Sequence, residues 1–370
     1  MRLDHVTLYR DPRFFAAFPS VSVLPSGEVL VLFRRARDRR RLLVDWNPAL
    51  DRHDHLDARS HLVLLRLSPA LQHLGAPEML PPDPEAGDQD ANLLVLRDGG
   101  LLVSGFCWYP LAPGDAPPLQ QVGAPVLGGA AEGWYLFWGG YTRRRAAGAT
   151  TWEDHAFLPP IPGVTDILPG RRPHHGGAQR GRSLELPDGR LLLASYAPGP
   201  SGRRGSHLFV SRDGGAAWHY GGPIAADPAA CLVEPALQRD AAGRLIAFHR
   251  TDGHADRLAT AESLDDGATW SPRRLHDVVG HPYDALALPD GRFLLVYGYR
   301  HRPFGVRARL YDPRRQLPEA APELVLRDDA AGPDVGYPWA ALLPDGAILV
   351  VYYFVGADGV RGIEATRLDW

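Results

Sequence analysis

The sequence predicts an all-β protein, a six-bladed β-propeller, and three observations support this prediction. An apolar segment, a turn ending in Gly and a second apolar segment recur six times along the chain. Most of these turns contain Asp-Gly, which favours a hairpin because Gly accepts the positive φ that the turn requires. Signals for helices are nearly absent, and hairpins repeated in this way are typical of propeller blades. The six copies are Val21–Phe33, Leu93–Ser104, Ser183–Tyr196, Pro235–Phe248, Leu286–Tyr297 and Ala341–Tyr352.

Each hairpin is followed by a weaker pair of strands, so a blade is expected to hold about four strands. After the last hairpin only Gly359–Trp370 remains, which supplies one further strand. The N-terminal segment Leu3–Arg10 precedes the first hairpin. We expect this N-terminal strand to join the last blade and close the ring, which leaves no open sheet edge. Residues 1–370 are predicted to form a single domain.

The composition excludes several chemistries. All 40 basic residues are Arg, and the formal net charge is -3. Without Lys the chain cannot form a Schiff base, attach pyridoxal phosphate or build a Walker A phosphate loop. No Gly-x-Gly-x-x-Gly motif follows an expected strand, and the chain is not basic. We therefore expect no cofactor and no nucleic-acid partner.

The cysteine content and the lengths of the apolar runs indicate the cellular compartment of the protein. The two cysteines, Cys107 and Cys231, cannot build a disulfide framework, so packing is expected to stabilise the fold. The N-terminal residues lack an apolar region of signal-peptide length. No apolar run approaches the roughly 18 residues of a membrane span. These features predict a cytoplasmic protein without a membrane partner.

Two segments, Ser211–Trp218 and Ser263–Trp270, share the Asp-box pattern Ser-x-Asp-x-Gly-x-x-Trp. The Asp carboxylate is expected to accept local backbone N–H groups in a turn between two outer strands. The Trp is expected to pack between blades. We assign both motifs a structural role.

Inner strands of a propeller converge on its axis, so equivalent residues at one end of these strands face a shared cavity. Nine residues before each turn Gly, four of the six residues are polar or ionisable. A second set, seven residues after each Gly, lies at the same rim, because a strand rises about 3.3 Å per residue. These positions predict a polar axial pocket. The first set is Phe18, Asp90, Arg180, Glu234, Pro282 and Tyr337, and the second is Arg34, Phe106, Tyr196, Arg250, Gly298 and Tyr353.

The hairpins and Asp-boxes resemble those of the sialidase superfamily, the BNR or Asp-box proteins with six-bladed propellers, over essentially the whole chain. In that family the fourth blade opens with Glu and closes its hairpin with Arg, which here are Glu234 and Arg250. The third strand of the fifth blade carries a second substrate Arg, matched by Arg307. The sixth blade opens with the nucleophilic Tyr, matched by Tyr337.

The resemblance implies a retaining exo-glycosidase acting on a terminal, acidic sugar, with Tyr337 as nucleophile and Glu234 as its base. A neutral Tyr suits a sugar whose anomeric carbon carries a carboxylate, because a carboxylate nucleophile would be repelled. Arg250 and Arg307 would bind that carboxylate in bidentate fashion.

The proton donor and the first substrate Arg match the family less well. A separate Asp protonates the leaving oxygen, and the matching segment offers Asp54 and Asp57, of which Asp57 is preferred. Sialidases begin the first blade with Phe-Arg-Ile-Pro, whose Arg completes a carboxylate-binding triad, but Ala17 stands at that position here. Other side chains expected to contact the substrate are Arg34, Asp90, Arg180 and His281, with Arg13 and Arg35 as further arginines near the pocket.

Two alternatives stay open beside a sialidase. One is a propeller that binds a glycan or acidic sugar at its axis without cleaving it, which the missing Arg at position 17 favours. The other is a glycosidase or lyase on uronic acids or another sugar, whose carboxylate is placed differently. No metal is expected, because His pairs in loops are usually solvated. The His-rich segments concerned contain His53, Asp54 and His55, and His174 and His175.

Overall fold

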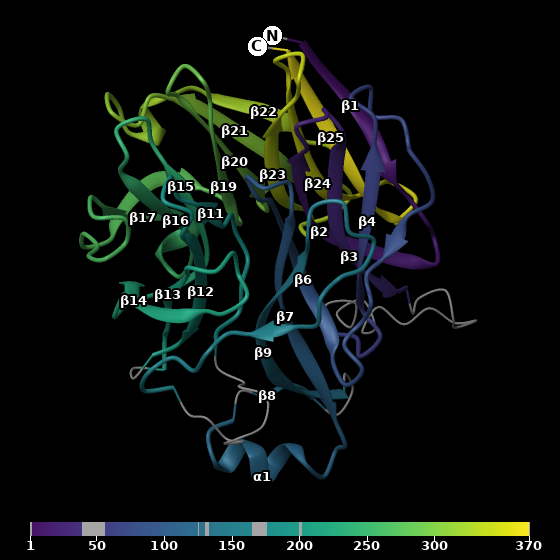
Figure 1. The fold of residues 1–370 in the computed structure, drawn as a ribbon, viewed down its shortest axis with the longest axis vertical. Helices are drawn as coiled ribbons and strands as arrows, with labels where there is room; N and C mark the ends of the chain where they lie inside the picture. Colours follow the sequence, from purple (N-terminus) through teal and green to yellow (C-terminus); the bar gives the residue numbers. More distant parts are fainter. Residues whose placement is uncertain are drawn as a thin grey trace.

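A computed structural model describes residues 2–38, 56–124, 126–129, 133–164, 176–199 and 202–369. Six antiparallel sheets surround a central axis, and the view in Figure 1 runs along that axis. The fold is therefore a six-bladed β-propeller, as the repeated hairpins predict. The described residues contain no helix long and apolar enough to cross a membrane.

The first three blades follow one another along the chain. Blade I holds β2 (Phe14–Val23), β3 (Val29–Arg37), β4 (His61–Leu67) and β5 (Glu78–Met79). Blade II holds β6 (Gly87–Val95), β7 (Leu101–Leu111), β9 (Gly133–Arg145) and β10 (Ala156–Phe157), with β8 (Val126–Gly129) paired to β9. Blade III holds β11 (Leu184–Glu185), β12 (Leu191–Pro198), β13 (Arg204–Ser211) and β14 (His219–Ala225).

The last three blades complete the ring. Blade IV holds β15 (Cys231–Arg239), β16 (Leu245–Asp252), β17 (Arg257–Ser263) and β18 (Arg274–Val279). Blade V holds β19 (Tyr283–Ala287), β20 (Phe293–Tyr299), β21 (Gly305–Tyr311) and β22 (Glu323–Arg327). Blade VI holds β23 (Gly336–Leu342), β24 (Ile348–Val355), β25 (Arg361–Asp369) and β1 (Arg2–Tyr9). Single 3₁₀ turns occur at His254–Asp256 and Pro318–Ala320.

The N-terminal strand closes the ring. β1 pairs antiparallel with β25, from Arg2 opposite Asp369 to Thr7 opposite Glu364. The two ends of the chain therefore lie together at the outside of blade VI (Figure 1). This pairing confirms the closure predicted from the unpartnered N-terminal segment.

The hydrophobic core lies between neighbouring blades, which explains the long apolar runs of the inner strands. Along β3, Val31 and Phe33 pack in a cluster shared with blade VI, whereas Leu30 and Leu32 pack in a cluster shared with blade II. Successive side chains of a strand point to opposite faces, so each blade buries both of its faces.

The six turn glycines adopt one conformation. Their φ values fall between 83° and 90°, the left-handed region that disfavours other residues. They are Gly27, Gly99, Gly189, Gly243, Gly291 and Gly346. The repeated turn explains why residues at equal sequence offsets occupy equivalent places in different blades.

A Pro-rich stretch of blade II contains regular structure. The Pro-rich stretch 110–133 holds the end of β7, the helix α1 (Ala116–Gln121) and β8. Pro117 and Pro118 are compatible with the first turn of α1, which begins at Ala116.

Both Asp-boxes connect outer strands, as predicted. In the first, Asp213 Oδ1 accepts the Ala217 N–H at 2.9 Å and the Ser211 hydroxyl at 2.8 Å. Trp218 reaches blade II, where its indole N–H donates to Thr142 at 2.9 Å. The motif thus holds neighbouring blades together.

Candidate active site at the propeller axis

Four of the six inner strands carry a β-bulge at the position nine residues before the turn Gly. Each bulge adds one residue to the inner strand and gives it a positive φ. A bulge redirects a side chain. A non-Gly residue with positive φ costs about 1–3 kcal/mol in conformational free energy, and residues strained in this way are common at functional sites. The four residues are Phe18, Asp90, Glu234 and Tyr337, with φ between 50° and 56°.

The second set of rim residues lies directly opposite these bulges. In each bulged blade, the residue before the bulge pairs with the residue seven positions after the turn Gly. The two sets therefore lie at one level, as the strand lengths predict. The pairs are Ala17 with Arg34, Gln89 with Phe106, Val233 with Arg250, and Gly336 with Tyr353.

Tyr337 and Glu234 meet at the axis. The Tyr337 hydroxyl donates to Glu234 Oε1 at 2.5 Å, and both residues are buried. Arg250 Nη1 lies 3.2 Å from Glu234 Oε2 and donates to Tyr337 Oη at 3.4 Å. The structure thus brings together three of the residues predicted from sequence.

The environment keeps Tyr337 neutral and Glu234 ionised. Burial and then the negative charge of Glu234 raise the pKa of Tyr337 well above its usual value. Burial also acts to raise the pKa of Glu234, but the charge of Arg250 and the hydrogen bonds from Tyr337 and Arg250 outweigh it, so this pKa is lowered. A neutral hydroxyl donating to a carboxylate is the protonation state from which Glu234 can remove the proton.

Arg250 makes contacts within the protein and also keeps one N–H group available to a ligand. Its Nη2 lies 3.0 Å from Asp252 Oδ1, which fixes the outer edge of the guanidinium. Its buried Nε has no acceptor among the described residues. A substrate oxygen would supply that acceptor.

Arg300 occupies the site although the sequence did not indicate it. Its Cζ lies 5.3 Å from the centre of the Tyr337 ring, and its Nη2 donates to Tyr353 Oη at 2.7 Å. Its Nε donates to the Val335 carbonyl at 3.2 Å. The available signal was the position of Arg300, which continues the same face of β20 two residues beyond the rim residue Gly298.

Arg307 is held within its own blade. Its guanidinium donates to the carbonyls of Arg327 and Pro303, and its Cζ lies 4.7 Å from the centre of the Tyr299 ring. No contact joins Arg307 to Tyr337 within the described chain. The structure thus separates the family's second Arg from the cluster.

Arg180 lies across the axis and ties blades together. Its Nη2 donates to the carbonyls of Pro19 at 2.9 Å and Tyr337 at 2.8 Å, and its Nη1 to that of Phe18 at 3.2 Å. Its Cζ stacks 5.2 Å from the rings of Tyr337 and Trp339. Arg180 therefore forms the floor beneath Tyr337.

Asp90 and Arg34 lie on the side of blades I and II. Burial raises the pKa of Asp90 to about 7, against the opposing charge of Arg180. The buried Oδ1 of Asp90 has no donor among the described residues. Arg34 is fully buried, and its Nε donates to the Asp88 carbonyl at 3.1 Å.

Asp57 and His281 are fixed by contacts outside the Tyr337 cluster. Asp57 Oδ1 accepts the Arg59 N–H at 2.8 Å in the turn before β4. His281 Nε2 lies 3.0 Å from Asp256 Oδ1, and burial lowers the pKa of this His.

Several further candidates contribute little to the site. Arg13 is exposed and forms an ion pair with Asp11, while Arg35 Nε contacts His61 at 3.0 Å. Five candidates lie outside the described residues. These are His53, Asp54, His55, His174 and His175.

An aromatic cleft adjoins the axial cluster. It has a volume of about 530 Å³ and includes two rim residues, Phe106 and Tyr196. Trp108 and Phe137 extend the apolar wall, and Arg204 also lines the cleft. Apolar walls with few polar groups are typical of small-molecule sites.

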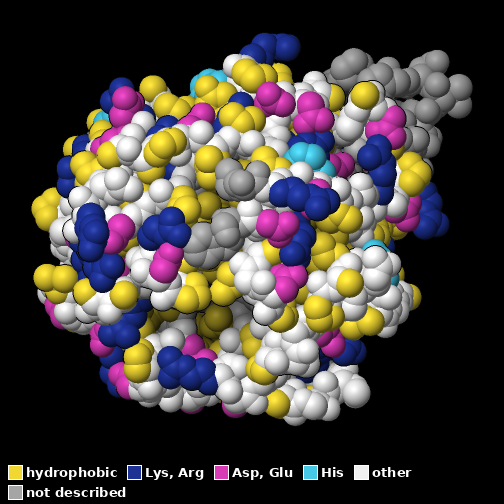
Figure 2. Space-filling view, turned by 90° about the horizontal axis from the view of Figure 1, so that it is seen from above, with side chains coloured by type: hydrophobic (Ala, Val, Ile, Leu, Met, Phe, Trp, Pro, Cys, Tyr) yellow, Lys and Arg dark blue, Asp and Glu magenta, His cyan; other side chains and the backbone are white. Residues whose placement is uncertain are grey.

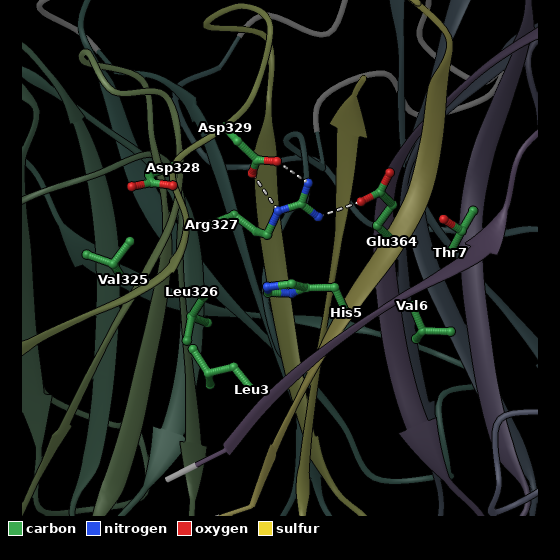
Figure 3. A pocket seen from close by; sticks show the side chains of 10 residues that line it. All are labelled: Leu3, His5, Val6, Thr7, Val325, Leu326, Arg327, Asp328, Asp329 and Glu364. Carbon is green, nitrogen blue, oxygen red and sulfur yellow. Dashed lines mark hydrogen bonds and ion pairs between the residues drawn. The ribbon is translucent and has the colours of Figure 1, made fainter. Parts of the chain in front are cut away.

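A second hollow, of about 650 Å³, lies between the outer strands β1 and β22. Figure 3 shows that Arg327 there pairs with Asp329 and Glu364 beside His5. The Arg327 charge is therefore paired within the protein. On the edge seen in Figure 2, acidic and basic side chains are mixed, without a large patch of one sign.

Comparison with known proteins agrees with the fold. The BNR repeat-like domain model matches residues 134–350. A Dyadobacter fermentans protein of unknown function is 33% identical, with a TM-score of 0.88, over 99% of this chain and 98% of its own. No functionally curated protein matches this chain in sequence.

Sialidases share the architecture at low identity. Hadza microbial sialidase Hz136 has a TM-score of 0.66 at 15% identity, over 99% of this chain and 68% of its own. Trypanosoma rangeli sialidase, in complex with 2,3-difluorosialic acid, has a TM-score of 0.66 at 14% identity, over 99% of this chain and 59% of its own. The chain therefore belongs to the BNR repeat-like domain family and has the six-bladed propeller fold of the sialidases.

Proposed function

We propose that this protein is a retaining exo-glycoside hydrolase that acts on a terminal acidic sugar, with Tyr337 as nucleophile and Glu234 as its base. The observation that carries this proposal is the 2.5 Å hydrogen bond from Tyr337 Oη to Glu234 Oε1 in a buried axial site. A nucleophile and a base within hydrogen-bond reach, with the base oriented by a third group, are what covalent catalysis needs. Arg250 is that third group.

The chemistry proceeds in two steps. Glu234 accepts the phenolic proton while Tyr337 Oη attacks the anomeric carbon, and the bond to the leaving oxygen breaks as that oxygen gains a proton from a carboxylic acid. Arg250, 3.4 Å from Oη, stabilises the charge that develops there. In the second step the former acid activates water, which displaces Oη, and Glu234 returns its proton.

The substrate is expected to carry a carboxylate. Arg250 and Arg300 flank Tyr337 and offer charged donors to such a group. Ala17 leaves the family's first Arg position without a charge. A sialic acid or a uronic acid fits this chemistry, and the aromatic cleft beside Phe106 and Tyr196 offers apolar surface for another part of the ligand.

Two carboxyl groups are candidates for the proton donor. Asp57 matches the family segment, whereas Asp90 is a bulge residue at the axis with a pKa raised by burial to about 7. Replacing the donor by Asn should spare substrates with good leaving groups and slow those with poor ones. Comparing Asp90→Asn with Asp57→Asn on a nitrophenyl glycoside and an alkyl glycoside assigns the role.

The direct test is release of a fluorescent aglycone from a panel of aryl glycosides that includes an α-sialoside and uronides. Turnover lost in Tyr337→Phe, together with a covalent adduct on Tyr337 from a fluorinated sugar, would support the proposal. Turnover that persists in Tyr337→Phe would contradict it.

A glycan-binding propeller without catalysis is the second candidate. Two arginines predicted to bind the substrate, Arg180 and Arg307, donate instead to backbone carbonyls of the protein. Because fewer arginines then remain for a catalytic site, this observation favours the second candidate. Calorimetry that detects sugar binding while the folded protein releases no product over days would support this function instead.

A further inference from the structure

We propose that Asp83, Cys107 and His155 in blade II form a binding site for Zn²⁺, separate from the axial site. One oxygen, one sulfur and one ring nitrogen of these residues all lie within 4.8 Å of one another. Asp83 lies in the loop before β6, Cys107 on β7 and His155 just before β10. Three different segments therefore bring together three different types of metal ligand.

The separations suit a tetrahedral ion. Zn²⁺ binds oxygen, nitrogen and sulfur at about 2.0–2.3 Å, so two ligands on one tetrahedral ion lie about 3.3–3.8 Å apart. His155 Nδ1 lies 3.7 Å from Asp83 Oδ2, beyond hydrogen-bond reach and within that range. The widest separation in the set, up to 4.8 Å, would close with shifts of about 1 Å or less.

The loops that carry two of the ligands are anchored to one side chain. Arg143 on β9 donates from Nε to the Glu153 carbonyl at 3.0 Å and from Nη1 to the Pro81 carbonyl. These carbonyls lie two residues from His155 and Asp83. Arg143 therefore holds both loops against the same strand, which preorganises the site.

Each ligand also has contacts of its own, and the Cys107 thiol donates to Asp88 Oδ1 at 3.7 Å. Asp83 Oδ1 accepts the N–H groups of Glu85 at 2.9 Å and Ala86 at 3.1 Å, so its Oδ2 is the oxygen that faces His155. The His155 ring contacts Tyr141 edge-on, with centroids 4.2 Å apart. Such outer contacts are typical of metal ligands, because they fix side-chain orientation and tune affinity.

The charges and burial of these three residues favour a bound metal ion and argue against a catalytic role for Cys107. Cys107 is fully buried, so its sulfur is not accessible to a substrate. A carboxylate and a thiolate together balance the charge of a divalent ion, and thiolate and imidazole ligands favour Zn²⁺. The His155 side chain is 10% exposed, which offers a path of entry. A bound ion would stabilise the loops of blade II. It would take no part in glycoside hydrolysis.

The test uses the full chain, stripped with a chelator and then titrated with Co²⁺ as a spectroscopic substitute for Zn²⁺. We expect one equivalent of Co²⁺, a sulfur-to-cobalt charge-transfer band and the intense visible bands of tetrahedral cobalt. Zn²⁺ should displace the cobalt and raise the thermal midpoint of unfolding. Cys107→Ser should lose the charge-transfer band, and His155→Ala should bind at least about tenfold more weakly.

Cys231→Ser is the matched control, because Cys231 is the second free thiol and lies on β15 in another blade. It should keep the full cobalt spectrum. Binding by the wild type without a thiolate band, no binding at all, or loss of the band in Cys231→Ser would each overturn the proposal. If Cys107→Ser does not fold, the partly exposed His155→Gln and the wild-type spectrum decide the matter.

Discussion

Tyr337 on blade VI and Glu234 on blade IV share a hydrogen bond of 2.5 Å, although 103 residues separate them along the chain. Each is a bulge residue with positive φ, at the same offset from its turn Gly. The repeat therefore positions two different side chains by one backbone device. Because blade V lies between their blades, the contact depends on how these three consecutive blades are arranged.

Removing either partner should lower turnover by orders of magnitude. Tyr337→Phe removes the attacking oxygen, and Glu234→Gln removes the base that accepts its proton. General-base catalysis contributes about 10²–10⁴-fold, so Glu234→Gln should lower kcat within that range, and Tyr337→Phe by at least about 10³-fold. Steady-state kinetics on the best aryl glycoside measure both effects.

Tyr352→Phe is the matched control for this pair. Tyr352 is also buried, but its hydroxyl contacts Thr366 at 2.8 Å within blade VI. Its kcat should stay within about twofold of wild type, because it lies outside the axial cluster. Near-normal rates in both Tyr337→Phe and Glu234→Gln would exclude the proposed mechanism.

Arg300→Ala should weaken catalysis on an acidic sugar far more than Arg307→Ala. Charge-assisted hydrogen bonds contribute about 1.5–3 kcal/mol, so kcat/KM should fall about 10- to 150-fold for Arg300→Ala. Arg307 donates to carbonyls of its own blade, so its loss should act mainly on stability. Arg300→Lys should recover part of the activity, and a larger kinetic effect at Arg307 would show that the family's assignment holds.

The rim could be predicted from sequence because the turn Gly sets the register of every hairpin. Counting from it identified Glu234, Tyr337 and Arg250, which do meet. The bulges were not predicted, although a Pro follows the bulged residue in three blades. Those dipeptides are Phe18-Pro19, Glu234-Pro235 and Tyr337-Pro338.

The partners of the arginines could not be predicted in the same way. Among the described residues, blade V, like blade III, has no bulge in its inner strand, so its rim differs from those of the four bulged blades. The side chain beside Tyr337 is Arg300 rather than Arg307. Arg180 stands at a predicted rim position, but its contacts are backbone carbonyls of blades I and VI. An Arg side chain is long and flexible, so it can reach many different acceptors. Which acceptors lie within its reach is determined only by the folded chain.

Arg180→Met should destabilise the fold strongly. The substitution leaves three carbonyls at the axis without this donor and removes the positive charge that acts most strongly on Asp90. Breaking a buried charged network of this kind costs about 3–5 kcal/mol in the free energy of unfolding. Urea unfolding measures it, with the exposed Arg66→Ala as control, which should cost less than about 1 kcal/mol. A similar loss for both variants would show that Arg180 is not structural.

The free energy of unfolding should depend less on pH in Asp90→Asn than in the wild type. Burial raises the pKa of Asp90 to about 7 in the folded protein, whereas the unfolded value is about 3.9. The folded state then binds the proton more tightly, so this contribution is fully present below about pH 4 and is lost as the pH rises through about 7. The difference corresponds to roughly 4 kcal/mol. Asn mimics the protonated side chain at every pH.

Urea unfolding at pH 5, 6, 7 and 8 compares the wild type with Asp90→Asn. The wild type should lose more stability over this range than the variant does. Asp98→Asn is the control, because Asp98 is exposed in the turn of the same hairpin. Parallel curves for wild type and Asp90→Asn would mean that Asp90 is ionised in the folded protein, paired with the arginines around the axis, and would remove it as a proton donor at neutral pH.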